Sequence, residues 1–256
     1  MMGATLDYSV IIPIYNEEES LEPLYRSIKK VMDTIGGKYE IIFVDDGSID
    51  SSAAILGHLA LESNVFKGII LKERVGQAQA WQAGFDTAVG NIYITMDGDG
   101  QNDPADIPLL LAKMNEGYDV AHGWRKNRQD PILKKIASGT AAIVRRLTTK
   151  DNIHDVGCSL RAFYKKDMEG VCLWGGLHRF FATIMIRKGC KVGEVVVSHH
   201  PREKGVTKYG IMGRLVEGTH DLLRVLFVDL NTLMDHKRTY EIKRIIGAEN
   251  GPAKNI

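Results

Sequence analysis

The chain has few cysteines, no long apolar run and almost no net charge, and each of these features excludes some kinds of protein. Its three cysteines, Cys158, Cys172 and Cys190, show no Cys-x-x-Cys spacing, so we expect reduced, buried thiols of a cytosolic protein. No segment approaches the roughly 18 apolar residues of a spanning helix, and the N-terminus lacks the pattern of a signal peptide. The sequence therefore predicts a protein that is soluble or at most membrane-associated.

Several function classes are also excluded or disfavoured. A formal net charge of +1 argues against general nucleic-acid binding, because affinity for a phosphate backbone needs a surplus of Lys and Arg. The chain lacks a Gly-x-x-x-x-Gly-Lys-Ser/Thr loop, a Gly-x-Gly-x-x-Gly after its first apolar run, and a Gly-x-Ser-x-Gly elbow. These absences disfavour P-loop phosphotransferases, dinucleotide oxidoreductases and Ser-His-Asp hydrolases.

Apolar runs of strand length alternate with segments of helical periodicity in the first half of the chain. The predicted strands are 8–14, 40–44, 68–71, 92–96 and 119–123, and the predicted helices are 21–35, 51–61, 76–89 and 104–116. Unbroken apolar strands in such an alternation indicate a parallel sheet covered on both faces. At 256 residues the chain fits one large α/β domain, alone or with an appendage.

Beyond residue 124 the alternation weakens. We predict a helix at 132–147, a strand at 190–197, an amphipathic helix at 211–234 and a polar tail at 236–256 that frays. The charged face of the 211–234 helix excludes a membrane span. Packing on the core and lying on a membrane surface both remain open for this helix.

Two carboxylates follow the predicted strand 92–96. Asp97 and Asp99 alternate with Gly98 and Gly100, and Gln101 adds an amide oxygen. Alternate residues at a strand end reach one rim of the sheet, and hard oxygen ligands suit Mg²⁺ or Mn²⁺. With so few protein ligands, water or substrate phosphates would complete the coordination. The alternative is a simple Asp/Gly turn between a strand and a helix.

Acidic and amide side chains also follow the first two strands. Asn16 and Glu17 come after 8–14, and Asp45 and Asp46 come after 40–44. Ligands of open α/β sheets collect at the carboxyl ends of the strands, where these turns meet. A cation there would bridge carboxylates to a diphosphate, and the second acidic pair would meet the polar parts of a nucleotide. The expected ligand is a nucleotide diphosphate compound.

Four ordered motifs carry a resemblance to a known family. They are Val10-Ile-Ile-Pro-Ile-Tyr-Asn-Glu17, Val44-Asp-Asp-Gly-Ser48, Gly76 to Gly84, and Met96-Asp-Gly-Asp-Gly-Gln-Asn-Asp-Pro104. From Tyr8 to Phe227 the chain resembles the inverting GT-A glycosyltransferases of family 2, and among them the polyprenyl-phosphate hexose transferases. The resemblance implies a GT-A (Rossmann-like), mostly parallel sheet with helices on both faces, plus a C-terminal amphipathic helix. It also implies a domain at 1–235, with a nucleotide and metal half at about 1–124 and an acceptor half at about 125–235, before the tail at 236–256.

The resemblance assigns roles to individual positions. Donor binding would involve Pro13, Tyr15, Asn16, Glu17, Asp45, Asp46, Gly76, Asp97 and Lys208, with Asp97, Asp99 and Gln101 holding Mg²⁺ or Mn²⁺. Acceptor binding would involve Arg125, Lys134, Ser138, Asp155 and Arg161. Asp99, Arg125 and Arg202 would be the catalytic residues, with Arg202 and Lys208 closing over the diphosphate. Lys134 stands where relatives often carry arginine, and it offers a point charge without a bidentate fork.

The implied reaction is metal-dependent, inverting transfer of a hexose from a nucleotide diphosphate sugar to a polyprenyl phosphate. Details around Gly-Trp-Arg125 favour a UDP-sugar, with GDP-mannose open, and the expected location is cytoplasmic or peripheral on the cytoplasmic face of a membrane. Two alternatives remain. One is a transferase of the same fold that acts on a saccharide and uses Asp155 as base. The other is a nucleotide-sugar binding module without turnover.

Overall fold

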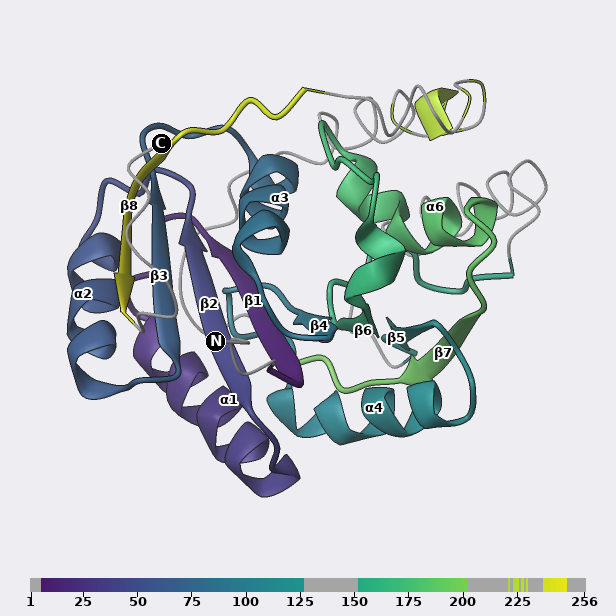
Figure 1. Cartoon of the computed structure of the whole chain (residues 1–256), viewed down its shortest axis with the longest axis horizontal. Helices are drawn as coiled ribbons and strands as arrows, with labels where there is room; N and C mark the ends of the chain where they lie inside the picture. The colour runs from purple at the N-terminus through teal and green to yellow at the C-terminus, as the bar shows by residue number, and fades with distance from the viewer. Residues whose placement is uncertain are drawn as a thin grey trace, which may run out of the picture.

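The computed structural model of the chain describes residues 6–126, 152–201, 221, 223–225, 227, 229 and 237–247. Within them eight strands form one sheet in the order β7-β5-β6-β4-β1-β2-β3-β8 (Figure 1). The strands are β1 Tyr8–Ile14, β2 Tyr39–Asp45, β3 Phe66–Leu71, β4 Ile92–Thr95, β5 Val120–Trp124, β6 Arg161–Tyr164, β7 Val192–Val196 and β8 Ile242–Gly247. The helices are α1 Leu21–Ile35, α2 Ser52–Glu62, α3 Gln77–Thr87, α4 Ile107–Asn115 and α6 Phe181–Arg187, with short 3₁₀ turns η1 Pro104–Asp106, η2 Lys165–Met168 and η3 Leu177–Phe180.

The sheet is mixed, with a parallel centre. Strand β1 pairs in parallel with both β2 and β4, β2 pairs in parallel with β3, and β5 with β7. Strand β6 is inserted antiparallel between β4 and β5, and β8 is antiparallel to β3 at the edge. The expected fold class is confirmed, and the two reversed strands are additions that the sequence did not reveal. The carboxyl ends of β1, β2 and β4 therefore lie side by side.

Helices cover both faces of the sheet because the strands carry apolar residues on both faces. On one face Val10, Ile12 and Phe43 form a core with α1, α2 and α4, and on the other Ile11 and Ile42 form a core with α3 and α6. Figure 1 shows α1, α2 and α4 along the left and lower sides of the sheet, and α3 and α6 above it. Helix α1 buries residues at helical spacing: Leu21, Leu24, Tyr25, Ile28 and Met32.

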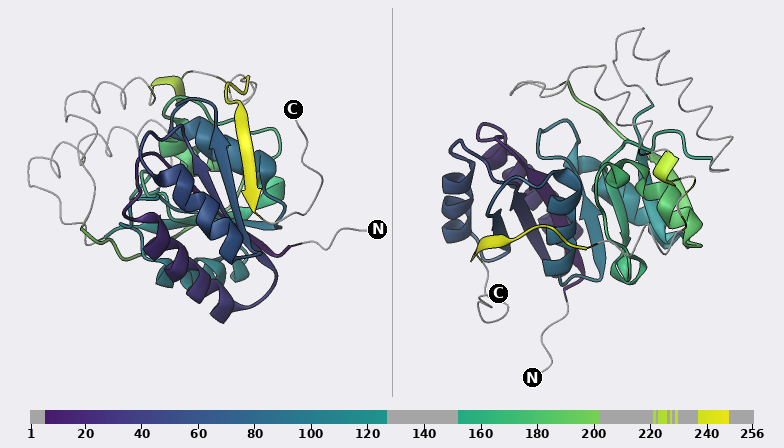
Figure 2. Two further views of the ribbon diagram at one scale, coloured as in Figure 1. Left: turned by 90° about the vertical axis from the view of Figure 1, so that its left-hand side faces the viewer. Right: turned by 90° about the horizontal axis from the view of Figure 1, so that it is seen from above.

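The expected fraying of the C-terminal tail is wrong for Ile242–Gly247. This segment forms β8 on the open edge of β3, and Figure 2 shows it in yellow beside that strand. Gly68 of β3 is necessary there, because a Cβ would lie 2.8 Å from Cγ1 of Ile246. The segment before β8 is also held in place, since Arg238 and the Tyr240 hydroxyl bind the Asp86 carboxylate. Burial of Ile246 and backbone pairing outweigh the polarity of the segment.

Further predictions concern the cysteines and the helices beyond residue 124. The structure describes all three cysteines as free thiols, with Cys158 and Cys172 buried and Cys190 partly buried. The expected helix at 132–147 lies outside the described residues, as does most of the expected helix at 211–234. Among the described helices, none is long and apolar enough to cross a membrane.

Candidate active site

The turns after β1 and β2 are joined by hydrogen bonds. The Asp46 amide donates to the carbonyl oxygen of Ile14 at 2.9 Å, which links the two strand ends. Asn16 adopts a left-handed backbone with φ 52°, a conformation that asparagine tolerates better than most residues. The backbone amide of Asn16 donates to Ser48 Oγ at 2.9 Å, and the side-chain Oδ1 accepts from the backbone amide of Ile49 at 2.9 Å. Asn16 therefore holds the two expected donor-binding turns together.

The two acidic residues after β2 lie in different surroundings. Asp45 Oδ1 accepts from the Ser48 amide at 2.9 Å, whereas its buried Oδ2 has no hydrogen-bond partner among the described residues. Burial raises the pKa of both carboxyls. The Asp46 carboxylate accepts from the amides of Val75 at 2.7 Å and Gly76 at 3.0 Å. Asp46 thus holds the loop before α3, whereas Asp45 leaves one oxygen without a partner among the described residues.

The backbone between Asp97 and Asp99 packs tightly on the end of β1. A Cβ on Gly98 would lie 2.7 Å from Cγ2 of Ile14, so only glycine fits between the two acids. Gly100 then turns the chain with φ +74°, in the region that glycine favours. Both aspartates are partly exposed at the rim. The local sequence therefore fixes two carboxylates next to the turn that holds Asp45.

Asp97 and Gln101 each make two further hydrogen bonds. Asp97 Oδ1 accepts from Gln77 Nε2 at 2.8 Å, and the Asp97 amide donates to Asn102 Oδ1 at 3.1 Å. Gln101 Nε2 donates to the His200 carbonyl oxygen at 3.2 Å, and the His200 amide donates back to the Gln101 carbonyl at 2.9 Å. This pairing brings the segment that leads to position 202 against the acidic turn.

The acidic turn fits a hard divalent cation only in part. Within the described ranges no group of three or more His, Cys, Asp or Glu side chains is arranged to hold a metal ion. Two rim carboxylates and one amide oxygen are ligands that Mg²⁺ and Mn²⁺ accept, but they leave most of the coordination sphere to other oxygens. The donor set therefore fits a cation that is bound together with phosphates.

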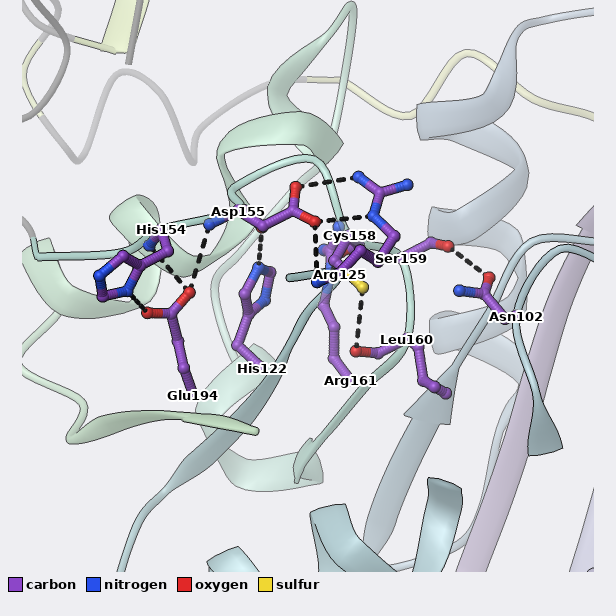
Figure 3. A network of polar contacts seen from close by, with 10 residues as sticks. All are labelled: Asn102, His122, Arg125, His154, Asp155, Cys158, Ser159, Leu160, Arg161 and Glu194. Carbon is purple, nitrogen blue, oxygen red and sulfur yellow. Dashed lines mark hydrogen bonds and ion pairs between the residues drawn. The ribbon is translucent and has the colours of Figure 1, made fainter. Parts of the chain in front are cut away.

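Arg125 and Asp155 form a buried ion pair beside this rim (Figure 3). Arg125 follows β5 directly, and its Nε and Nη2 donate to the two carboxylate oxygens of Asp155 at 2.7 and 2.9 Å. Burial would raise the pKa of Asp155, but the hydrogen bonds and charge of Arg125 outweigh it and hold that pKa below its usual value. Burial would lower the pKa of Arg125, and Asp155 raises it instead, with a smaller contribution from Asp97. The structure thus brings together two residues assigned to the acceptor.

Arg161 is buried, and its guanidinium makes its contacts within the protein. It is 6% exposed, and its guanidinium donates to the carbonyl oxygens of Cys158 at 2.8 Å and His178 at 3.0 Å, above the ring of Phe181. Burial lowers the pKa of Arg161 to about 10. These contacts make Arg161 a support for the turn that carries Asp155, while its acceptor role stays a prediction.

Four expected site residues, Lys134, Ser138, Arg202 and Lys208, lie outside the described residues. Conversely, sequence reasoning missed Asn102, His122 and Glu194, although each carried a signal. Asn102 lies inside the acidic motif, where its Oδ1 also accepts from Ser159 Oγ at 2.9 Å. His122 and Glu194 each interrupt an apolar strand run, which marks a polar side chain with a specific partner.

Comparison with known proteins identifies the family. The family described as Glycosyl transferase family 2 matches residues 9–171. The chain is 39% identical over 228 residues to dodecaprenyl-phosphate galacturonate synthase from Rhizobium johnstonii, covering 87% of this chain and 67% of the relative. It is 38% identical over 219 residues to undecaprenyl-phosphate 4-deoxy-4-formamido-L-arabinose transferase from Klebsiella pneumoniae, covering 85% and 67%. The chain therefore belongs to glycosyl transferase family 2, and it is a glycosyltransferase.

Solved structures support the fold. Glucosyl-3-phosphoglycerate synthase from Mycobacterium tuberculosis, in complex with Mn²⁺ and uridine-diphosphate-glucose, has a TM-score of 0.67 at 16% identity, over 88% of this chain and 80% of that one. The same enzyme with phosphoglyceric acid gives 0.67 at 18% identity, over 88% and 81%. At such low identity the likeness concerns the fold alone.

Proposed function

We propose that this glycosyltransferase moves a hexose from a nucleotide diphosphate sugar to a polyprenyl phosphate, with inversion at the anomeric carbon and with Mg²⁺ or Mn²⁺ on the donor diphosphate. A UDP-sugar is the favoured donor, and GDP-mannose is the other candidate. The curated relatives are named for transfer to dodecaprenyl and undecaprenyl phosphate, and a structural neighbour was solved with Mn²⁺ and uridine-diphosphate-glucose. The observation that carries the proposal is an arginine fork fixed beside an acidic rim.

On the donor side, four carboxylates have complementary tasks. Asp97 and Asp99 would hold the cation, with Gln101 as a third oxygen ligand, and the bound cation would neutralise charge on the leaving diphosphate. The unpartnered Asp45 Oδ2 is suited to accept from an N–H or O–H group of the nucleotide. Asp46 would act indirectly, because its carboxylate keeps Gly76 in place beside the donor.

On the acceptor side, the chemistry requires placement more than proton transfer. A phosphate oxygen is already ionised near neutral pH, so it can attack the anomeric carbon while the bond from that carbon to the diphosphate oxygen breaks. The diphosphate leaves with the bonding electron pair. Asp155 uses two of the five guanidinium N–H groups of Arg125. No partner among the described residues takes the other three, which would be able to orient an anionic oxygen.

The geometry disfavours a saccharide acceptor activated by Asp155. A general base works best when its pKa lies near the operating pH. The Asp155 carboxylate instead has its pKa held below the usual value, and both of its oxygens accept hydrogen bonds from Arg125. Asp155 is therefore better suited to orient Arg125 than to remove a proton from a sugar hydroxyl.

Peripheral contact with a membrane would bring the lipid phosphate to this site. The side chains of Leu223 and Phe227 support such contact, since they are 46% and 81% exposed. Co-sedimentation with vesicles that contain polyprenyl phosphate should recover the protein, and Leu223→Ser with Phe227→Ser should reduce that recovery. Equal recovery of both proteins would rule out a role for these two side chains.

The reaction itself is tested with radiolabelled UDP-glucose, UDP-N-acetylglucosamine and GDP-mannose, each with and without a short polyprenyl phosphate. We expect label to move into the lipid fraction with one of these donors, and excess chelator to stop the transfer. Label in an added oligosaccharide would support the saccharide alternative, and binding of the donor without any transfer would support a binding module. Either result would refute the proposed reaction.

A further inference from the structure

Glu194 of β7 holds the backbone that carries Asp155. Its Oε1 accepts from the amides of His154 at 2.8 Å and Asp155 at 3.3 Å, and its Oε2 lies 2.6 Å from His154 Nδ1. The Glu194 side chain is only 13% exposed, whereas the His154 side chain with which it pairs is 45% exposed. Charge-assisted bonds from backbone amides to a shielded carboxylate are among the stronger hydrogen bonds in proteins.

His122 of β5 holds the same residue, Asp155, through its carbonyl oxygen. His122 and Glu194 are register partners in the parallel pair β5 and β7, so their side chains leave the same face of the sheet. His122 Nε2 lies 2.7 Å from the Asp155 carbonyl oxygen, and because a carbonyl only accepts, Nε2 must carry the hydrogen. Two adjacent strands thus fix both the N–H and the C=O of Asp155, as Figure 3 shows.

This arrangement continues directly to Arg125. The Asp155 carboxylate binds the Arg125 guanidinium at two points, and its Oδ2 also accepts from the Arg125 backbone amide at 3.2 Å. The His154 ring stacks on Trp124, the residue before Arg125, with ring centroids 4.2 Å apart. A shift of the 154–155 backbone would therefore move the guanidinium.

We infer that Glu194 is a positioning residue for Arg125, acting through Asp155. The inference rests on the proposed function, in which Arg125 meets the acceptor phosphate. Glu194 touches neither substrate in this scheme. It determines where the guanidinium points, and so its loss should affect the acceptor and leave donor binding unchanged.

Steady-state kinetics test the functional part. In Glu194→Ala, kcat/KM for polyprenyl phosphate should fall about 10- to 100-fold, the cost of a misplaced group, while KM for the donor changes by less than about twofold. Glu194→Gln keeps one acceptor oxygen and should recover part of the loss. Glu116→Gln, an exposed glutamate paired with Lys113, is the matched control and should behave as wild type.

A double-mutant cycle separates action through Arg125 from a general structural effect. If Glu194 acts through Arg125, Glu194→Ala should cost much less in an Arg125→Lys background than in wild type. Equal losses in both backgrounds, or equal losses for donor and acceptor, would overturn the inference.

Amide hydrogen exchange followed by NMR needs no lipid acceptor, and so it distinguishes the inference from the proposed function. In Glu194→Ala the amides of His154, Asp155 and Arg125 should all exchange faster, with the Arg125 amide reporting transmission through the Asp155 carboxylate. Faster exchange at 154 and 155 with unchanged exchange at 125 would refute the positioning role. If the exchange pattern holds while the wild type transfers nothing to the lipid, the proposed function alone fails.

Discussion

Replacement of Asp155 by asparagine should destabilise the protein measurably, because it removes one partner of a buried ion pair. The Arg125 and Asp155 side chains are 9% and 16% exposed, and three hydrogen bonds of 2.7 to 3.2 Å join the two residues. Loss of one partner of a buried pair costs about 3–5 kcal/mol, and asparagine keeps one acceptor oxygen, so we expect about 3 kcal/mol. For a chain of this size that lowers Tm by roughly 6–12 °C.

The assay is thermal and urea unfolding at pH 7, with Glu22→Gln as the control. Glu22 Oε1 accepts from both Nε and Nη2 of Arg26, but both side chains of this pair are more than half exposed. An exposed pair is screened by solvent, so the control should unfold as wild type does. Because the pKa of Asp155 is lowered, its contribution is present at neutral pH and is lost as pH falls through that lowered pKa. If Asp155→Asn and Glu22→Gln unfold alike at pH 7, the buried pair stabilises the protein no more than the exposed pair, and the prediction is wrong.

Three further predictions concern other parts of the site. Gly98→Ala, between the two acids, should cost about 1–3 kcal/mol in unfolding free energy and abolish most transfer, because the added Cβ would lie 2.7 Å from Ile14 Cγ2. Gly100→Ala is the control: its Cβ would meet open space, but its φ is +74°, so it separates backbone strain from the clash. Burial lowers the pKa of His122 to about 3, so below pH ~6.5 the unfolded chain binds a proton that the folded state excludes. Urea unfolding should therefore give an unfolding free energy about 2 kcal/mol lower at pH 5 than at pH 7. His122→Gln should flatten that dependence. Asp46→Asn should weaken nucleotide binding in calorimetry without altering kcat/KM for the acceptor, because it frees the amides of Val75 and Gly76; an unchanged nucleotide affinity would contradict the assigned role of Asp46.

The centre of the fold was predictable from sequence because its strands are continuous apolar runs. The expected strand at 8–14 and helix at 21–35 coincide with β1 and α1, and most other bounds in the first half differ by one or two residues. The pattern worked there because each strand is buried on both faces and each helix has one apolar face.

The reversed strands were missed for a physical reason. Strand β6 has four residues and begins with Arg161, whose guanidinium binds backbone carbonyls in the interior. Strand β8 mixes isoleucine with Lys243 and Arg244, since an edge strand exposes part of its surface. Composition identifies such strands poorly, because pairing with β4 and β3 stabilises them.

The candidate site was predictable where its residues follow strands in motifs. Asp45 and Asp97 occupy strand ends as expected, and Arg125 lies close enough for Asp97 to contribute to its pKa. The pairing of Arg125 with Asp155 was not predicted, since it joins positions thirty residues apart. The support from Glu194 depends on the register of β5 and β7, which no single sequence reveals.

The most direct test of the account is calorimetric titration of the wild-type protein with UDP and with GDP, in Mn²⁺ and in excess chelator. We predict that Mn²⁺ tightens binding of one nucleotide at least about tenfold, or 1.4 kcal/mol, and that Asp97→Asn with Asp99→Asn removes the difference. Equal affinity with Mn²⁺ and with chelator in the wild type would contradict the claim that these two carboxylates hold a cation on the donor diphosphate.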